Sequence, residues 1–258
     1  MHRPGFVALA LAATWILIQP PQALAQSKAL PPPPKPYGAV TFTLPRPSTD
    51  ASFETFRKEL AAIVKRRAQA DLVKLVVEKG FFWERDFGGS FEADKSSIEN
   101  FTRAFHFGRD GGDSWERLAA IAEVRAVSRH ERRRGLVCAP GEPTYNQAAL
   151  DKLYDATKTD GLDWALPRTA TTPVRSAPQA TAPVMDTLKL TFVRYLGHSG
   201  PDNDPDPLVN HWAQVVLPSG KTGYVAPGSL TTLFVERLCF GKDARGRWRI
   251  AGYVGGGD

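Results

Sequence analysis

Residues 212–226 read WAQVVLPSGKTGYVA, and this stretch decides how the C-terminal half of the chain folds. Two runs rich in valine and aromatic residues flank a Pro-Ser-Gly segment, which is a turn composition between two strands. The second run ends near Tyr224, directly after Gly223, as the returning strand of a tight hairpin does. The stretch therefore predicts a β-hairpin in a small barrel, with Trp212 at its start.

A second motif lies upstream of this hairpin. Residues 174–188 follow the order V-R-S-x-P-x-x-x-x-P-V-x-x-x-L. Together the two motifs resemble the bacterial SH3 (SH3b) domain over residues 172–233. In that family the first motif forms the RT-loop strand and the second forms the hairpin that carries the tryptophan. The resemblance implies a small β-barrel and leaves only a short linker, about residues 165–172, ahead of it.

Trp212 and Tyr224 are the candidate ligand-binding residues. In SH3b-like barrels such aromatic residues either belong to the core or line a shallow groove that binds peptide segments of peptidoglycan. Because successive side chains of a strand point to opposite faces, a buried Val225 would turn Tyr224 outward. Both placements, core and groove, agree with the sequence. The partner expected from the resemblance is peptidoglycan or an envelope protein.

The first 25 residues have the composition of a secretory signal peptide. Arg3 precedes an apolar run from Phe6 to Ile18, and Ala23-Leu24-Ala25 supplies a small-x-small cleavage site. The apolar run is shorter than the roughly 20 residues that span a bilayer. We therefore predict cleavage, a mature chain without a transmembrane segment, and export to the periplasm or secretion.

The charge balance narrows the choice of partner. The chain has 33 Lys and Arg against 27 Asp and Glu, a net charge of +6, and these charges are spread along its length. Such a mild excess favours solubility and weak attraction to acidic envelope polymers, and it gives a nucleic-acid partner little support. The sequence also predicts no cofactor.

Cys138 and Cys239 are the only cysteines of the chain. In an oxidising compartment a single pair most simply forms one disulfide. The loop that this bond closes would stabilise the fold by about 4 to 5 kcal/mol in the chain-entropy description. Two free thiols are the alternative. The bond would tie the N-terminal region to the C-terminal tail.

Sequence periodicity divides the rest of the chain. Residues 26–47 are rich in proline and predict an extended tether. Apolar residues recur at helical spacing from Phe53, behind Asp50 as a candidate N-cap. Further helices are expected near residues 71–80, 97–107, 114–127 and from 146.

The predicted fold class is α+β. A mostly helical N-terminal domain, residues 48–165, would be followed by the small SH3-like β-barrel at 172–233. Residues 234–258 would form an extra C-terminal β-hairpin that packs between the two domains. An isolated hairpin is marginal in water, so this apolar hairpin needs a surface to cover.

The sequence contains no complete metal-binding or nucleophile motif. Asp202, Asp204 and Asp206 alternate as at the start of a calcium-binding loop, but proline and alanine follow where that loop needs glycine and glutamate. His106 and His130 lack a zinc-hydrolase spacing. Cys138 lacks the polar, glycine-rich surroundings of a papain-like nucleophile. We therefore predict no metal site and no catalytic residue.

Three function hypotheses remain. The leading one is an exported, non-enzymatic envelope protein that binds through its SH3b-like module. The second is a cell-wall-turnover enzyme with its site in the helical domain, around Glu84, Asp86 or His106. The third is a small-ligand pocket, because the first two helices and the aromatic strand after them resemble the opening of the NTF2-like cone fold. The helices expected after Ser97 depart from that family's mainly β second half.

Overall fold

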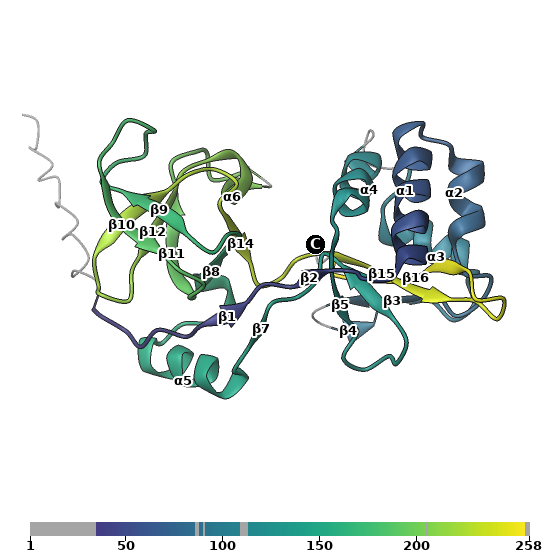
Figure 1. Ribbon diagram of the computed structural model, residues 1–258, viewed down its shortest axis with the longest axis horizontal. Coiled ribbons are helices and arrows are strands. Elements are labelled where there is room, and N and C mark those ends of the chain that lie inside the picture. The colour runs from purple at the N-terminus through teal and green to yellow at the C-terminus, as the bar shows by residue number, and fades with distance from the viewer. Residues whose placement is uncertain (1–34, 86–87, 90, 109–112, 205, 256–258) are drawn as a thin grey trace, which may run out of the picture. The chain divides into compact units, whose positions relative to one another are not determined.

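The computed structural model describes residues 35–85, 88–89, 91–108, 113–204 and 206–255. These residues form one two-stranded and two seven-stranded β-sheets, with short helices packed on them (Figure 1). The predicted signal peptide lies outside the described residues. The predicted fold class is wrong, because the described chain is mostly β and the region expected to be mostly helical is built around a β-sheet.

This first sheet and the helices on it are called the α/β part. Its strands run in the order β2-β5-β6-β15-β16-β3-β4. Their bounds are Arg46–Pro47 (β2), Ala126–Arg129 (β5), Val137–Ala139 (β6), Arg237–Lys242 (β15), Trp248–Val254 (β16), Phe82–Arg85 (β3) and Gly88–Gly89 (β4). The strands are antiparallel except for β16 and β3, which are parallel with Tyr253 opposite Trp83.

The C-terminal hairpin explains why the helical prediction failed. Strands β15 and β16 lie inside the sheet, between β6 and β3, although the chain passes through a whole second sheet before reaching them. Periodicity within a short window cannot show a partner so far away in sequence. Without that partner, the segment before residue 140 reads as helices with a few short apolar strands.

Four helices belong to the α/β part, and Figure 1 shows α1, α2 and α4 on one side of β15 and β16. They are α1 (Ala51–Lys65), α2 (Gln69–Leu75), α3 (Ser97–Ala104) and α4 (Asp113–Glu123). The prediction for α1 is confirmed, because the Asp50 side chain accepts hydrogen bonds from the backbone of Ser52 and Phe53. Helix α2 ends before residue 80, where the prediction ended it, because Val76 is extended and bridges to Ile250.

One hydrophobic core joins these helices to the sheet. Leu60 of α1, Phe101 of α3 and Leu118 of α4 are buried against Ile250 and Tyr253 of β16. Strands β15 and β16 therefore complete a core whose helical members lie more than a hundred residues earlier in the sequence. The predicted disulfide is confirmed in the same sheet, where Cys138 of β6 lies opposite Cys239 of β15.

The second seven-stranded sheet covers the region predicted to be a barrel and is called the barrel part for that reason; its strands run in the order β10-β9-β13-β12-β11-β8-β14. All neighbouring strands are antiparallel. Their bounds are Val184–Leu188 (β10), Thr172–Arg175 (β9), Thr222–Val225 (β13), Ala213–Val216 (β12), Val193–His198 (β11), Trp164–Pro167 (β8) and Leu230–Thr232 (β14). The hairpin predicted from the opening stretch is confirmed as β12 and β13.

The interior of the barrel part is aliphatic. Val174, Val193, Val215 and Val225 are buried together, which accounts for the alternation of valine with polar residues along these strands. The short helix α6 (Pro207–Asn210) adds Leu208 to the same cluster. Strand β8 takes up residues that composition assigned to a linker.

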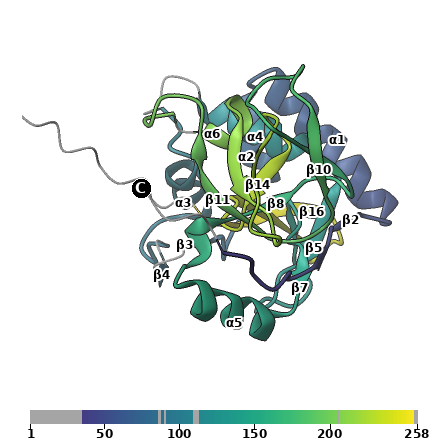
Figure 2. The same cartoon turned by 90° about the vertical axis from the view of Figure 1, so that its left-hand side faces the viewer.

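A third cluster packs residues 37–44 of the proline-rich stretch against the barrel part. Helix α5 (Gln147–Thr157) lies beside the barrel strands in both views (Figures 1 and 2). It packs with β1 (Phe42–Thr43), β7 (Thr144–Tyr145) and Trp164, which follows the short 3₁₀ helix η1 (Gly161–Asp163). Upstream, the Tyr37 hydroxyl donates to the Val216 carbonyl at 2.7 Å. Burial raises the pKa of Tyr37 well above its usual range, so this phenol stays protonated.

Candidate functional site

Trp212 and Tyr224 lie on the outer face of the barrel part. Tyr224 on β13 stands directly opposite Gln214 on β12 and Arg175 on β9. The next residue, Val225, is fully buried, so alternation turns Tyr224 outward, where it is half-buried. Trp212 is also half-buried and directly precedes β12, and its carbonyl accepts from the Ser199 N–H, so the β11–β12 pairing extends to it. Because Trp212 lies two positions from Gln214, it belongs to the same face.

The polar atoms of this face are free to bind. No residue that the structure describes forms a hydrogen bond with the Tyr224 hydroxyl, the Trp212 indole N–H or the Gln214 amide. Beside them, Arg175 donates through Nη1 to the Ala182 carbonyl at 2.6 Å, which fixes the guanidinium. We call Arg175, Trp212, Gln214 and Tyr224 the aromatic row. It combines two ring faces with unused donors and one fixed positive charge.

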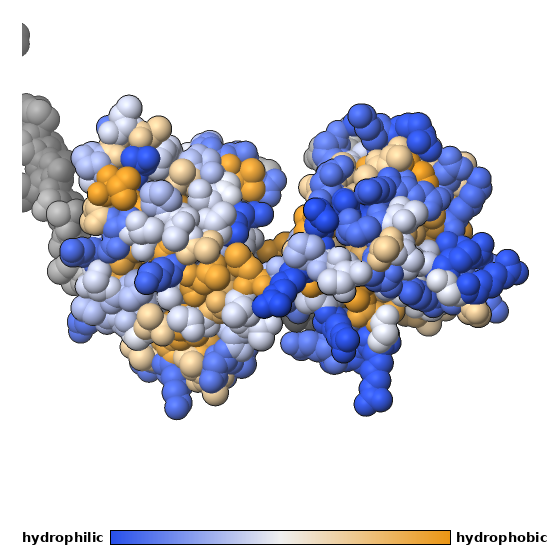
Figure 3. Space-filling model, viewed as in Figure 1, coloured by the Kyte–Doolittle hydropathy of each residue, from blue (hydrophilic) through white to orange (hydrophobic). Residues whose placement is uncertain are grey.

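The exposed apolar side chains of the barrel part are scattered over its surface. Val184 and Met185 lie on β10, Leu196 on β11 and Val209 on α6. In the view of Figure 3, the hydrophobic colour over this part forms separate patches among polar residues. Scattered surface residues of this kind are normal for a folded domain, so the aromatic row carries the argument for binding.

The acidic loop before β12 is organised by one aspartate. Asp204 accepts the Asp206 backbone N–H at 2.7 Å and a contact from His211 Nε2 at 2.8 Å. The Asp206 N–H, followed by the Asn210 and His211 side chains, lowers the pKa of Asp204. The His211 ring stacks on His198, with ring centroids 5.6 Å apart. Among the described residues, no group of three His, Cys, Asp or Glu side chains is placed to hold a metal ion.

Glu84 is bound by two arginines. Its Oε1 accepts from Arg133 at 2.8 and 2.9 Å, and its Oε2 accepts from Arg132 at 3.0 Å. Partial burial raises the pKa of Glu84, but the Arg133 hydrogen bond and both guanidinium charges outweigh it, so the pKa lies below its usual value. Buried His130 lies 3.7 Å away, and its burial lowers the pKa of the ring. Glu84 is therefore an ionised carboxylate in a charge cluster.

Among the described residues, His106 of the enzyme hypothesis does not join this cluster. His106 follows α3 in a left-handed backbone conformation with φ of 55°, and it is not among the partners of Glu84. Asp86 lies outside the described residues. The structure thus joins Glu84, a candidate of the enzyme hypothesis, to His130 and to two arginines that the sequence did not connect with it.

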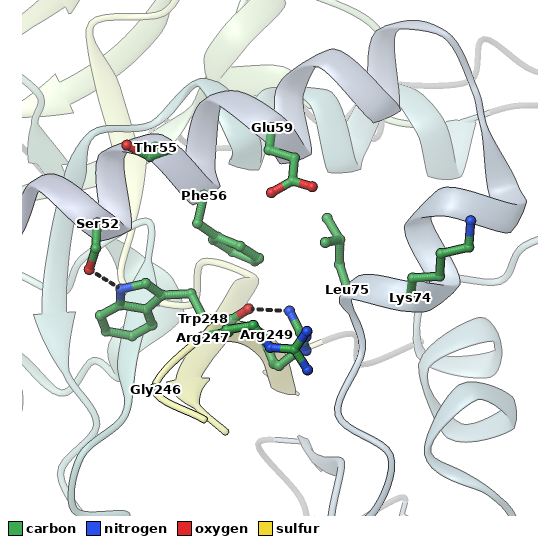
Figure 4. Close-up of a pocket in the computed structure, with 10 residues that line it drawn as sticks. All are labelled: Ser52, Thr55, Phe56, Glu59, Lys74, Leu75, Gly246, Arg247, Trp248 and Arg249. Carbon is green, nitrogen blue, oxygen red and sulfur yellow. Dashed lines mark hydrogen bonds between the residues drawn. The ribbon is translucent and has the colours of Figure 1, made fainter. Parts of the chain in front are cut away.

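Sequence reasoning missed a cleft beside α1. Its lining comes from α1, from the end of α2 and from the turn that leads into β16 (Figure 4). These segments are far apart in the chain, and no motif joins them. The only signal in the sequence was the charged turn between the two apolar runs of the C-terminal hairpin, residues 242–249.

Comparisons with known proteins give no indication of function, so the function is inferred from the residues of the chain. No family model, no curated protein and no solved structure matched this chain. Within the described residues, no helix has the length and apolar character needed to cross a membrane. The confirmed disulfide is consistent with an exported protein, because such bonds persist in oxidising compartments.

Proposed function

We propose that this is a non-enzymatic binding protein of the bacterial cell envelope, exported to the periplasm or secreted. Its barrel part acts as an SH3b-like module that binds peptidoglycan, with an envelope protein as the alternative ligand. The observation that carries the proposal is the aromatic row, where Trp212 and Tyr224 are half-buried and their polar atoms have no partner in the part of the chain that the structure describes.

The chemistry of the row suits a peptide ligand. Tyrosine and tryptophan offer a large apolar contact together with a polar group at the edge, which is why they are enriched in binding surfaces. The Gln214 amide can both donate to and accept from a peptide group. Arg175 adds a positive charge for a ligand carboxylate, such as those on the peptide stems of peptidoglycan.

Features outside the barrel also support this proposal. The first 25 residues have the composition of a signal peptide, and the chain contains a disulfide. The net charge of +6 favours association with acidic wall polymers. The competing enzyme needs a general acid at Glu84, and the low pKa of that carboxylate opposes this role.

The test is co-sedimentation with purified peptidoglycan, combined with an assay for soluble muropeptides. We expect the protein to pellet with peptidoglycan and to release no muropeptides. Failure to pellet would contradict wall binding and leave the envelope protein as ligand. Release of muropeptides that is lost in a Glu84→Gln variant would instead establish the cell-wall enzyme.

A further inference from the structure

The cleft beside α1 is large enough for a small ligand. Its volume is about 490 Å³, within the roughly 300–1,000 Å³ range of small-molecule sites. Figure 4 shows Phe56 of α1 and Leu75 of α2 on opposite sides of the space. Its lining residues are Ser52, Thr55, Phe56, Glu59, Lys74, Leu75, Gly246, Arg247, Trp248 and Arg249.

One wall of the cleft carries an unpaired negative charge. Glu59 is exposed on α1 and reaches toward the space above Arg247 and Arg249 (Figure 4). It forms no ion pair or hydrogen bond with any described residue. Lys74 does not neutralise it, because the Lys74 ammonium is bound to Asp71 at 2.9 Å. The Glu59 carboxylate is therefore available to a cationic group.

The opposite wall carries two positioned guanidinium groups. Arg247 Nε donates to Asp243 Oδ2 at 3.1 Å, and Arg249 Nη2 lies 3.2 Å from the same oxygen. Arg249 also donates through Nη1 to the Trp248 carbonyl at 3.0 Å. The backbone N–H of Arg247 is the main cause of a lowered pKa at Asp243, so this carboxylate stays ionised and keeps both arginines in place.

Arg247 has donors to spare. A guanidinium carries five N–H donors, and in the described residues only the Nε of Arg247 is used. Its two terminal nitrogens can face a carboxylate side by side, in the paired geometry that makes arginine the usual partner of this group. Asp243 is one carboxylate facing two guanidinium groups, so this wall keeps a net positive charge. Glu59 and Arg247 do not pair with each other across the cleft, and the Glu59 carboxylate and the terminal nitrogens of Arg247 have no partner among the described residues.

We propose that this cleft binds a small zwitterion, an amino acid or a short peptide. The ligand ammonium contacts Glu59, its carboxylate contacts Arg247, and its apolar body lies between Phe56 and Leu75. A ligand with only one of these charges leaves the other wall unpaired and binds more weakly. This site is separate from the aromatic row and does not depend on the role of the barrel part.

The reporter for this site is the indole N–H of Trp248. It donates to Ser52 Oγ at 3.0 Å, and both residues line the cleft. The probe is the dipeptide alanyl-leucine, titrated into the ¹⁵N-labelled protein and followed by NMR. N-acetyl-alanyl-leucine lacks the ammonium group, and alanyl-leucinamide lacks the carboxylate. We expect alanyl-leucine to shift the Trp248 indole resonance and the amides of residues 246–249.

Two exposed substitutions give a crossed test. Glu59→Gln should weaken alanyl-leucine binding roughly tenfold and leave the N-acetyl peptide unaffected, whereas Arg247→Gln should weaken alanyl-leucine similarly and leave the amide unaffected. Glu78→Gln and Arg245→Gln are matched controls outside the lining and should change neither affinity. Unshifted resonances outside the cleft verify folding. No shift at the cleft, or equal losses for all three peptides in each variant, would overturn the proposal.

Discussion

Removal of the Cys138–Cys239 bond should destabilise the α/β part selectively. The two half-cystines lie opposite each other on β6 and β15, are fully buried, and are separated by 101 residues. For a flexible loop of about 100 residues, the chain-entropy description gives about 4.7 kcal/mol. The loop contains the whole barrel part, however, and a barrel that stays folded shortens the flexible chain. The effect then falls toward the value of about 3 kcal/mol for a short loop.

The assay is guanidinium chloride unfolding of the oxidised protein and of a Cys138→Ala, Cys239→Ala double variant. With a denaturant slope of roughly 3 to 5 kcal/mol/M, a loss of about 3 to 4.7 kcal/mol lowers the midpoint by on the order of 1 M. Amide exchange should show the loss at β6, β15 and β16, with the barrel strands unchanged. Coincident unfolding curves, or equal loss of protection in both parts, would refute the reasoning. Alkylation of both cysteines without reductant would show that the bond is absent.

Three substitutions probe the rest of the fold. Ile250→Ala, at the fully buried centre of the first core, should lower the free energy of unfolding by about 2–5 kcal/mol in chemical denaturation. Leu162→Ala, at an exposed position, should change it by less than about 0.5 kcal/mol, and similar losses in the two variants would contradict the described core. Gly252→Ala should cost about 1–3 kcal/mol, because the added methyl group would overlap the Phe82 ring, and Phe82→Leu in the same chain should recover part of the loss. An unchanged melting temperature would refute this contact. Glu84→Gln should lower the free energy of unfolding by about 1 kcal/mol near pH 7. Because the folded-state pKa of Glu84 is lowered, the difference in stability from the parent protein should disappear as pH falls through that pKa. A difference in stability that persists or grows in acid would contradict the charge cluster.

The sequence was informative where interactions are local. Asp50 capping α1 and the β12–β13 hairpin both follow from residues within one short window. The disulfide followed from the presence of only two cysteines and the expected compartment. The facing of Tyr224 followed from alternation once Val225 was found buried.

The sequence could not predict the pairing of strands that lie far apart in the chain, and this pairing determines the fold class. The parallel contact between β3 and β16 joins Trp83 to Tyr253, and no periodic pattern links such distant segments. The helices expected near residues 97–107 and 114–127 are present as α3 and α4, but they pack on a sheet that the sequence did not predict. The cleft could not be predicted for the same reason, since Glu59 and Arg247 come to face each other across it only when the terminal hairpin enters the sheet.

The central claim is that Trp212 and Tyr224 form a ligand-binding surface. The most direct measurement is the affinity for purified peptidoglycan, by co-sedimentation, of a Trp212→Ala, Tyr224→Ala double variant. Truncation of an aromatic residue at the centre of an interface typically costs about 2 kcal/mol or more, so we predict at least a thirtyfold loss of affinity with the fold intact. Phe91→Ala, at an exposed aromatic residue of the α/β part, should bind as the parent protein does. Parental affinity in the double variant would contradict the account.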